Sequence, residues 1–223
     1  MRSLVRVIGW LAVAVALPVA SGLSVGRLGA VIGVGASVVV LLYAWLWLPR
    51  SAHAAFEAGR FARAARRYRV LEAIAASARR RRAALLSRSG CAVARGELAA
   101  AERLLARVEA AALDTSERAV WLNNRACAAL AARHDPHAAL ALVDEASALR
   151  PDVPALQHTR GMALLAVGRI DDAIAVLDGM RSGGELPARL EADRCRDLAR
   201  AWALKGETAY AEDYRLRADA LAR

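Results

Sequence analysis

From about residue 50 onward, apolar residues recur at the three- and four-residue intervals of amphipathic helices, most clearly between Pro154 and Pro187. A first helix there carries Gly161 and Leu164. It is expected to end at Gly168, because glycine readily takes the left-handed conformation that closes a helix. A second helix places its apolar residues on one stripe: Ile170, Ala173, Ile174, Leu177 and Met180. One such pair cannot bury its own apolar face, so further copies are expected.

The spacing of this pair recurs in four other places. The shared pattern is a small residue, a turn residue seven positions later, an alanine, a large residue and a final apolar residue. Two copies are weaker, because His134 replaces the turn glycine in one and Arg215 takes the large position in the other. By subtraction, the turns at Gly59, Gly96, His134, Gly168 and Gly206 lie 37, 38, 34 and 38 residues apart. The other four sets are Ala52, Gly59, Ala64, Tyr68, Leu71; Ser89, Gly96, Ala101, Leu105, Val108; Cys127, His134, Ala139, Val143, Ala146; and Ala199, Gly206, Ala211, Arg215, Ala218.

These residues resemble the tetratricopeptide repeat (TPR), a helix-turn-helix unit of about 34 residues. The turn and the start of the second helix read Gly-Arg-Ile-Asp-Asp-Ala at 168–173 and Gly-Arg-Phe-Ala-Arg-Ala at 59–64. Asn123-Asn124, just after Trp121, resembles the family's first helix. The resemblance covers about 51–223 and implies that residues 49–223 form an all-α, TPR-like helix-turn-helix solenoid of about five repeats.

Two uncharged apolar stretches, at about 7–26 and 28–48, precede the repeats. At about 1.5 Å per residue, each is long enough to cross the roughly 30 Å hydrocarbon layer of a bilayer. The short link at Arg27 leaves no room for a domain, so residues 1–48 are predicted to form a transmembrane helical hairpin. A cleavable signal peptide with a small-residue site at 19–21 is the alternative interpretation of the first stretch.

Small residues repeat within the two apolar stretches at the spacing that lets membrane helices approach closely. They are Gly22, Gly26, Gly29, Gly33 and Ser37. Packing within the hairpin, packing between protomers and no role at all are the three interpretations that the pattern leaves open.

Positive charge is concentrated in the front of the chain, since residues 1–90 carry 14 arginines against Glu57 and Glu72, whereas residues 91–223 carry a net charge of −2. Arginines flank both ends of the predicted hairpin, so the positive-inside rule places both ends in the cytoplasm. Tyr43, Trp45 and Trp47 would then lie at the membrane interface as an aromatic belt. The layout is similar to that of bacterial proteins with two spans followed by such repeats, which predicts a multi-pass protein of the bacterial inner membrane with its repeats facing the cytoplasm.

Several arginines surround the first predicted repeat. The run at 79–82 is either a solvated loop or helix start, or a contact for anionic lipid heads or an acidic partner, and nucleic acid is the least favoured ligand. On a helix beginning near Phe61, the other arginines lie opposite the apolar stripe and can face a membrane surface. The candidates for contact with anionic lipid or an acidic partner are Arg63, Arg66, Arg67, Arg69, Arg79, Arg80, Arg81 and Arg82.

The resemblance also implies a binding groove, because the first helices of TPR proteins line a concave face. Asparagine in this face can hydrogen-bond a peptide backbone, and arginine can meet carboxylates. The residue set by which chaperone-binding members clamp a terminal carboxylate is not recognisable in the first repeats. The register predicts that the groove is lined by Asn123, Cys127, His158, Met162, Leu165, Arg196 and Arg200.

No pattern in the sequence points to catalysis. His134-Asp135-Pro136-His137 is best interpreted as a turn, Asp171-Asp172 as a helix start, and the dispersed Cys91, Cys127 and Cys195 as structural thiols. Phosphate loops, nucleophile motifs and dinucleotide fingerprints do not occur. We therefore predict no enzyme activity, cofactor, metal or small-molecule substrate.

These patterns together predict a membrane-anchored scaffold that binds a protein or peptide partner through the concave groove. An accessory or assembly factor for a membrane-bound enzyme or envelope pathway is the alternative. Such a factor would contact its client through the transmembrane spans.

Overall fold

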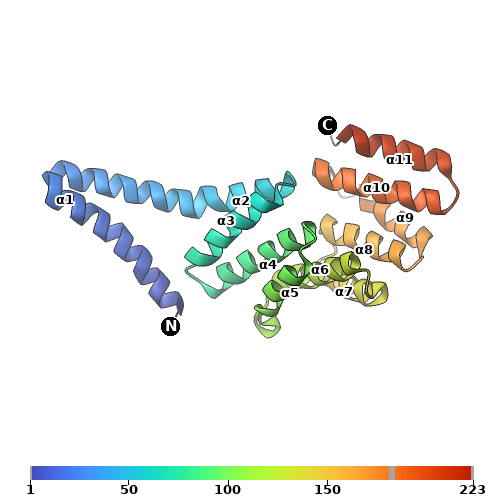
Figure 1. Cartoon of the computed structure of the whole chain (residues 1–223), viewed down its shortest axis with the longest axis horizontal. Coiled ribbons are helices and arrows are strands. Elements are labelled where there is room, and N and C mark those ends of the chain that lie inside the picture. Colours follow the sequence, from blue (N-terminus) through green and yellow to red (C-terminus); the bar gives the residue numbers. More distant parts are fainter. Residues whose placement is uncertain (1, 181–183, 222–223) are drawn as a thin grey trace.

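The computed structural model describes residues 2–180 and 184–221 of the 223-residue chain, and every regular element in these residues is helical. The predicted all-α fold class is confirmed for this part of the chain. A long bent helix at the N-terminus leads into a curved stack of shorter helices (Figure 1).

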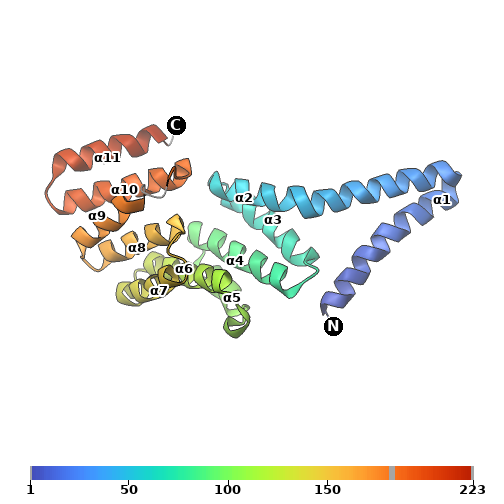
Figure 2. The same cartoon turned by 180° about the vertical axis from the view of Figure 1, so that it is seen from behind.

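Helical hairpins build the stack, and each consists of two consecutive helices joined by a short turn. Consecutive hairpins pack on one another, so the described residues form an α-solenoid, seen from both sides in Figures 1 and 2. A 3-10 helix, η2 (Ala110–Ala112), lies between the second and third hairpins. The pairs are α2 (Leu48–Glu57) with α3 (Phe61–Ile74), α4 (Ala78–Ala94) with α5 (Leu98–Ala106), α6 (Thr115–Ala132) with α7 (Pro136–Leu149), α8 (Pro154–Ala166) with α9 (Ile170–Gly179), and α10 (Ala188–Leu204) with α11 (Thr208–Leu221).

Four of the predicted turn glycines close the first helix of a hairpin in the left-handed conformation. Gly59, Gly96, Gly168 and Gly206 have φ angles of 69°, 72°, 80° and 82°. A side chain is strained at these angles, which explains why glycine recurs at this point of the repeat. The small residues seven positions earlier are fully buried in the first, second and fourth hairpins.

The third turn differs from the sequence prediction by one residue. Arg133, rather than His134, takes the left-handed conformation, with φ 54°. The extra residue after it lets Asp135 cap α7 by accepting a hydrogen bond from the backbone N–H of Ala138 at 2.9 Å. The small position therefore shifts to Ala126, which is fully buried, whereas Cys127 is only half-buried and turns towards the concave side.

The fifth hairpin has an open outer face, which explains its weak match to the repeat pattern. Ala199 and Ala211 are only half-buried, and Arg215 is exposed and paired with Glu212 at 2.6 Å. Because α11 packs mainly on α10, the position that is large and apolar in the other hairpins faces solvent here. A charged residue is tolerated there for that reason.

The N-terminal helix α1 (Arg2–Leu42) bends sharply at Gly26, whose φ of 67° and ψ of −150° interrupt the helix. The chain thus reverses beside Arg27, and two helical limbs diverge from the bend (Figure 1). One helix among the described residues, Gly26–Glu57, is long and apolar enough to cross a membrane. The first limb is helical in its backbone, and its crossing of a membrane stays a prediction.

The second limb continues into the solenoid without a linker. A stretch of π-helix, η1 (Tyr43–Trp47), joins α1 directly to α2, the first helix of the first hairpin. Apolar side chains of the limb are not covered by other parts of the described structure: Val31 is 69% exposed and Val39 is 65% exposed. The predicted division between residues 48 and 49 falls inside a continuous helix, so the apolar limb and the solenoid share one rigid element.

Candidate partner-binding groove

The concave side of the solenoid holds a groove of about 940 Å³. Its walls come from α4, α6, α8 and α10, the first helices of the second to fifth hairpins, and Phe56 of α2, in the first hairpin, also lines it. The first helices lie on the inside because their small residues let the second helices pack behind them. This arrangement matches the register from which the groove residues were predicted.

Six of the seven predicted groove residues line this groove, and Leu165 does not. Leu165 is 4% exposed and belongs to the apolar core beside Leu164 and Leu177. The next residue, Ala166, lines the groove instead, because one position along a helix turns a side chain by about 100°. The six that line it are Asn123, Cys127, His158, Met162, Arg196 and Arg200.

Several groove residues were missed by the sequence reasoning, above all the acidic face of α10. Asp193 and Asp197 are spaced by four residues and lie on the same side of the helix as Arg196 and Arg200. This spacing was visible in the sequence, but only the fold shows which face of α10 turns inward. The other lining residues with polar side chains that the register missed are Asn124, Arg133, Thr159 and Arg189.

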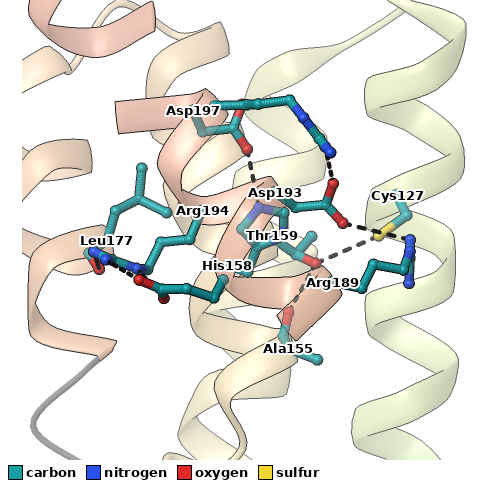
Figure 3. Close-up of polar contacts among 11 residues, drawn as sticks. Cys127, Ala155, His158, Thr159, Leu177, Arg189, Asp193, Arg194 and Asp197 are labelled. Atoms are coloured by element: carbon teal, nitrogen blue, oxygen red, sulfur yellow. Dashed lines mark hydrogen bonds and ion pairs between the residues drawn. The ribbon is translucent and has the colours of Figure 1, made fainter. Parts of the chain in front are cut away.

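One polar contact ties α8 to α10 beside the groove, and further ion pairs lie within α10 (Figure 3). His158 Nε2 lies 2.9 Å from Asp197 Oδ2, and their side chains are only 13% and 20% exposed. Asp193 is paired with Arg196 and lies 3.5 Å from a guanidinium nitrogen of Arg189. Both aspartates are therefore engaged by basic groups of the protein itself, and the groove retains an excess of positive charge.

Two groove arginines have no ion pair among the residues that the structure describes. Arg200 projects from the exposed part of α10, and Arg133 closes α6. An anionic group in the groove can bind their guanidinium groups without breaking an existing pair.

Asn123 offers a further unsatisfied group. Its side-chain oxygen is buried and accepts no hydrogen bond in the described structure. The neighbouring Asn124 has a structural role instead, since its Nδ2 donates to Leu86 O at 2.9 Å and Ser89 Oγ at 3.0 Å. A buried acceptor without a donor is costly, so Asn123 favours a ligand with an N–H group.

The three cysteines are held as neutral thiols. Burial raises the pKa of Cys91 to about 11 and also raises the pKa of Cys127 and Cys195. Thr159 donates its only hydroxyl proton to Ala155 O at 3.0 Å, so the Cys127 thiol donates to Thr159 Oγ1 at 3.4 Å. This geometry fits the predicted structural role and gives no reactive thiolate.

The mouth of the groove is bridged by a contact between the first and last hairpins. The guanidinium carbon of Arg189 on α10 lies 4.7 Å from the ring centre of Phe61 and 5.8 Å from that of Phe56. The two rings are packed edge to face at 5.3 Å, on either side of the Gly59 turn. Figures 1 and 2 both show this turn beside the start of α10.

Replacing Arg189 with alanine is expected to separate the two ends of the solenoid. A cation–π contact of this kind contributes about 0.5–1 kcal/mol, so its loss moves an open–closed equilibrium roughly twofold to fivefold. Spin labels on Arg60→Cys and Ala188→Cys should report longer distances by pulsed electron resonance in Arg189→Ala than in the wild type. Arg196→Ala is the matched control, because Arg196 also contacts Asp193 but does not reach the first hairpin. An identical distance distribution in Arg189→Ala and the control would contradict the bridge.

The predicted cluster of arginines near the membrane divides into two groups. Arg63, Arg66 and Arg69 are exposed on α3, whereas Arg67 on the same helix is half-buried and donates to Ser51 O. The arginines of the run at 79–82 begin α4, and two of them pair with the residues that cap α6: Arg79 lies 3.5 Å from Asp114 and Arg82 lies 3.0 Å from Glu117. Part of the run thus holds the second hairpin to the third.

No protein-family model matches this chain, and no curated protein matches it. Two solved structures have similar folds. One is described as a Podospora anserina kinesin light chain with nearly identical TPR-like repeats; it is 20% identical, covers 78% of this chain and 93% of its own, and has a TM-score of 0.49. The other, described as MamA MSR-1 C2, is 18% identical, covers 81% of this chain and 97% of its own, and has a TM-score of 0.46.

The stacked hairpins are TPR-like. The assignment of this fold rests on the chain itself, on its closing glycines, its buried small residues and the inward position of its first helices.

Proposed function

We propose that this protein is a membrane-anchored scaffold that holds a partner protein, as an extended segment, in the concave groove. The groove itself supports the proposal: its polar residues include a buried acceptor on Asn123, and its Arg133 and Arg200 have no ion pair within residues 2–180 and 184–221. An extended peptide supplies a partner for each: its backbone N–H groups can donate to the Asn123 oxygen, and its carboxylates can pair with the arginines. The proposal includes no chemical step and no cofactor.

The anchor in this proposal is the N-terminal region, residues 1–48, as two spans. The exposed apolar surface of the helix Gly26–Glu57 supports membrane insertion of the second span. The excess of arginine on both flanks supports a cytoplasmic position of the solenoid at a bacterial inner membrane. The continuous helix from the apolar limb into α2 means that the groove is held at a fixed place relative to the membrane.

The test is site-specific photo-crosslinking with the full-length protein in native membranes. A photoreactive side chain at Met162, which lines the groove, should capture a discrete partner. The triple variant Asn123→Ala, Arg196→Ala, Arg200→Ala should reduce that capture about tenfold or more, since each lost hydrogen bond to a charged group costs roughly 1.5–3 kcal/mol. The double variant Arg103→Ala, Arg215→Ala removes exposed arginines from second helices and should leave capture unchanged.

The alternative, an accessory factor that contacts its client through the spans, has support in the same apolar surface. It predicts capture from a photoreactive side chain at Val39, which is 65% exposed on the apolar limb, and none from Met162. Capture of a protein at Val39 alone would replace the groove proposal with this one.

A further inference from the structure

The corner between α3 and α4, residues 70–80, lies level with the aromatic end of the apolar limb. Arg67 on α3 donates from Nη1 to Ser51 O at 2.7 Å, which fixes the register between α3 and α2. These two helices run in opposite directions, so the residues of α3 that follow Arg67 lie beside those that precede Ser51. The start of α4 confirms this level, because the guanidinium carbon of Arg80 lies 3.8 Å from the ring centre of Trp45.

Two arginines from different helices thus hold the end of the limb. The guanidinium carbon of Arg67 lies 5.3 Å from the ring centre of Trp47, while Arg80 covers Trp45. Residues two apart on a helix point in nearly opposite directions, so the two arginines contact the end of the limb at two separate places. The solenoid is therefore fixed on the limb and does not hang from it by a flexible link.

Aromatic residues at this level are half-exposed and follow an exposed apolar surface. Tyr43, Trp45 and Trp47 are 49%, 47% and 49% exposed, and the preceding Val39 and Leu42 are 65% and 51% exposed. Tryptophan and tyrosine are enriched at the headgroup level of membranes, where their rings contact both apolar chains and polar groups. If the limb spans a membrane, the α3–α4 corner lies among the headgroups.

The chemistry of the corner fits anionic lipid. Between Ala58 and Arg95 the only acidic residue is Glu72, which is buried and held by Arg88 and Arg107. The segment therefore presents positive charge with no exposed carboxylate of its own; Asp114, which caps α6 of the third hairpin, lies 3.5 Å from Arg79, whose side chain remains 78% exposed. Its exposed arginines and large apolar residues at and near the corner are Arg66, Arg69, Val70, Arg79 and Arg80.

Stacking on Trp45 orients the Arg80 guanidinium group so that it can bind a phosphate. A guanidinium group that lies with its face on an aromatic ring keeps its N–H groups in the plane, where they can meet two oxygens of one phosphate. Each arginine near an anionic leaflet also strengthens binding roughly fivefold, an attraction that salt weakens over a Debye length of about 8–10 Å.

We propose that the α3–α4 corner is a membrane seat that binds anionic phospholipid, with Arg80 and Arg79 holding headgroup phosphate and Val70 reaching the interface. This inference rests on the proposed membrane anchor and adds a second contact to it. With both contacts in place, the solenoid keeps one tilt relative to the bilayer, and the mouth of the groove keeps one orientation towards a partner.

The test uses the full chain in nanodiscs of phosphatidylcholine with or without phosphatidylglycerol. Native mass spectrometry counts the phosphatidylglycerol retained by each protein. The double variant Arg79→Gln, Arg80→Gln should retain it about fivefold to thirtyfold more weakly than the wild type, as expected for two arginines at an anionic surface. The control Arg103→Gln, Arg215→Gln makes the same change in net charge away from the corner and should bind like the wild type.

Spin labels at Val70→Cys and Val39→Cys separate failure of the seat from failure of the anchor. The seat predicts that the Val70 label is shielded from a water-soluble relaxation agent in anionic nanodiscs and becomes accessible in the double arginine variant. If the Val39 label lies in hydrocarbon but the Val70 label is fully hydrated, the seat proposal is wrong and the anchor proposal is retained. Hydration of both labels overturns the anchor and the seat together. Equal lipid retention by the double variant and its control also overturns the seat.

Discussion

Gly161→Leu is expected to prevent the fourth hairpin from folding, and Gly161→Ala to lower the unfolding free energy by about 1–3 kcal/mol. A Cβ atom at Gly161 would lie 2.6 Å from both Cγ and Cδ2 of Leu177, which is fully buried in the main apolar core. Since Leu177 cannot turn away without opening the core, α8 and α9 must move apart. Thermal and urea unfolding followed by circular dichroism measure the effect.

Gly179→Ala is the matched control for this prediction. Gly179 ends α9, and a Cβ atom there would have nothing within 4 Å. Alanine also favours the helix over glycine, so stability should stay the same or rise slightly. Equal unfolding midpoints for Gly161→Ala and Gly179→Ala would show that the close approach of α8 to α9 is not needed.

Arg194→Met is expected to destabilise the solenoid by about 3–5 kcal/mol, the usual loss when one partner of a buried ion pair is removed. The Arg194 side chain is 1% exposed, and its Nε and Nη2 each donate to Glu191 at 2.7 Å. Nη1 donates to Leu177 O at 3.2 Å, which joins α10 to α9. Methionine fills a similar volume but leaves the Glu191 carboxylate and the Leu177 carbonyl without this donor.

Arg215→Met tests whether burial is the cause of this effect. Arg215 pairs with Glu212 at the same three-residue spacing, but its side chain is 63% exposed. A solvated pair contributes little, so no measurable change in the unfolding midpoint is expected. Equal losses in the two variants would indicate that helix propensity, rather than the buried pair, explains the destabilisation.

The two predicted effects meet at Leu177, whose side chain contacts Gly161 and whose carbonyl accepts from Arg194. Substitutions that share a contact residue are not expected to add. The double variant Gly161→Ala, Arg194→Met should therefore lose less stability than the two single losses combined.

The sequence by itself determined the repeat and its turns, because these depend on local backbone conformation and on side-chain size. A glycine that closes a helix and a small residue seven positions earlier mark each hairpin wherever both occur, as at Gly161 and Gly168. The prediction was off by one residue at the third turn, where Arg133 takes the left-handed conformation. Arginine has no preference for this conformation, so its residue type could not mark the turn. The length and composition of the apolar limb were likewise readable without a structure.

The tertiary structure alone decided which side chains meet across hairpins. Arg189 lies 128 positions from Phe61, by subtraction, and the two meet only because small rotations between successive hairpins add up to a curve that brings the ends together. The same curvature turns Asp193 and Asp197 into the groove and leaves Leu165 in the core. The burial of Arg194 and the stacking of Arg80 on Trp45 also depend on packing between separate helices. A repeat pattern describes one hairpin, whereas these contacts arise from the angles between hairpins, which no single repeat encodes.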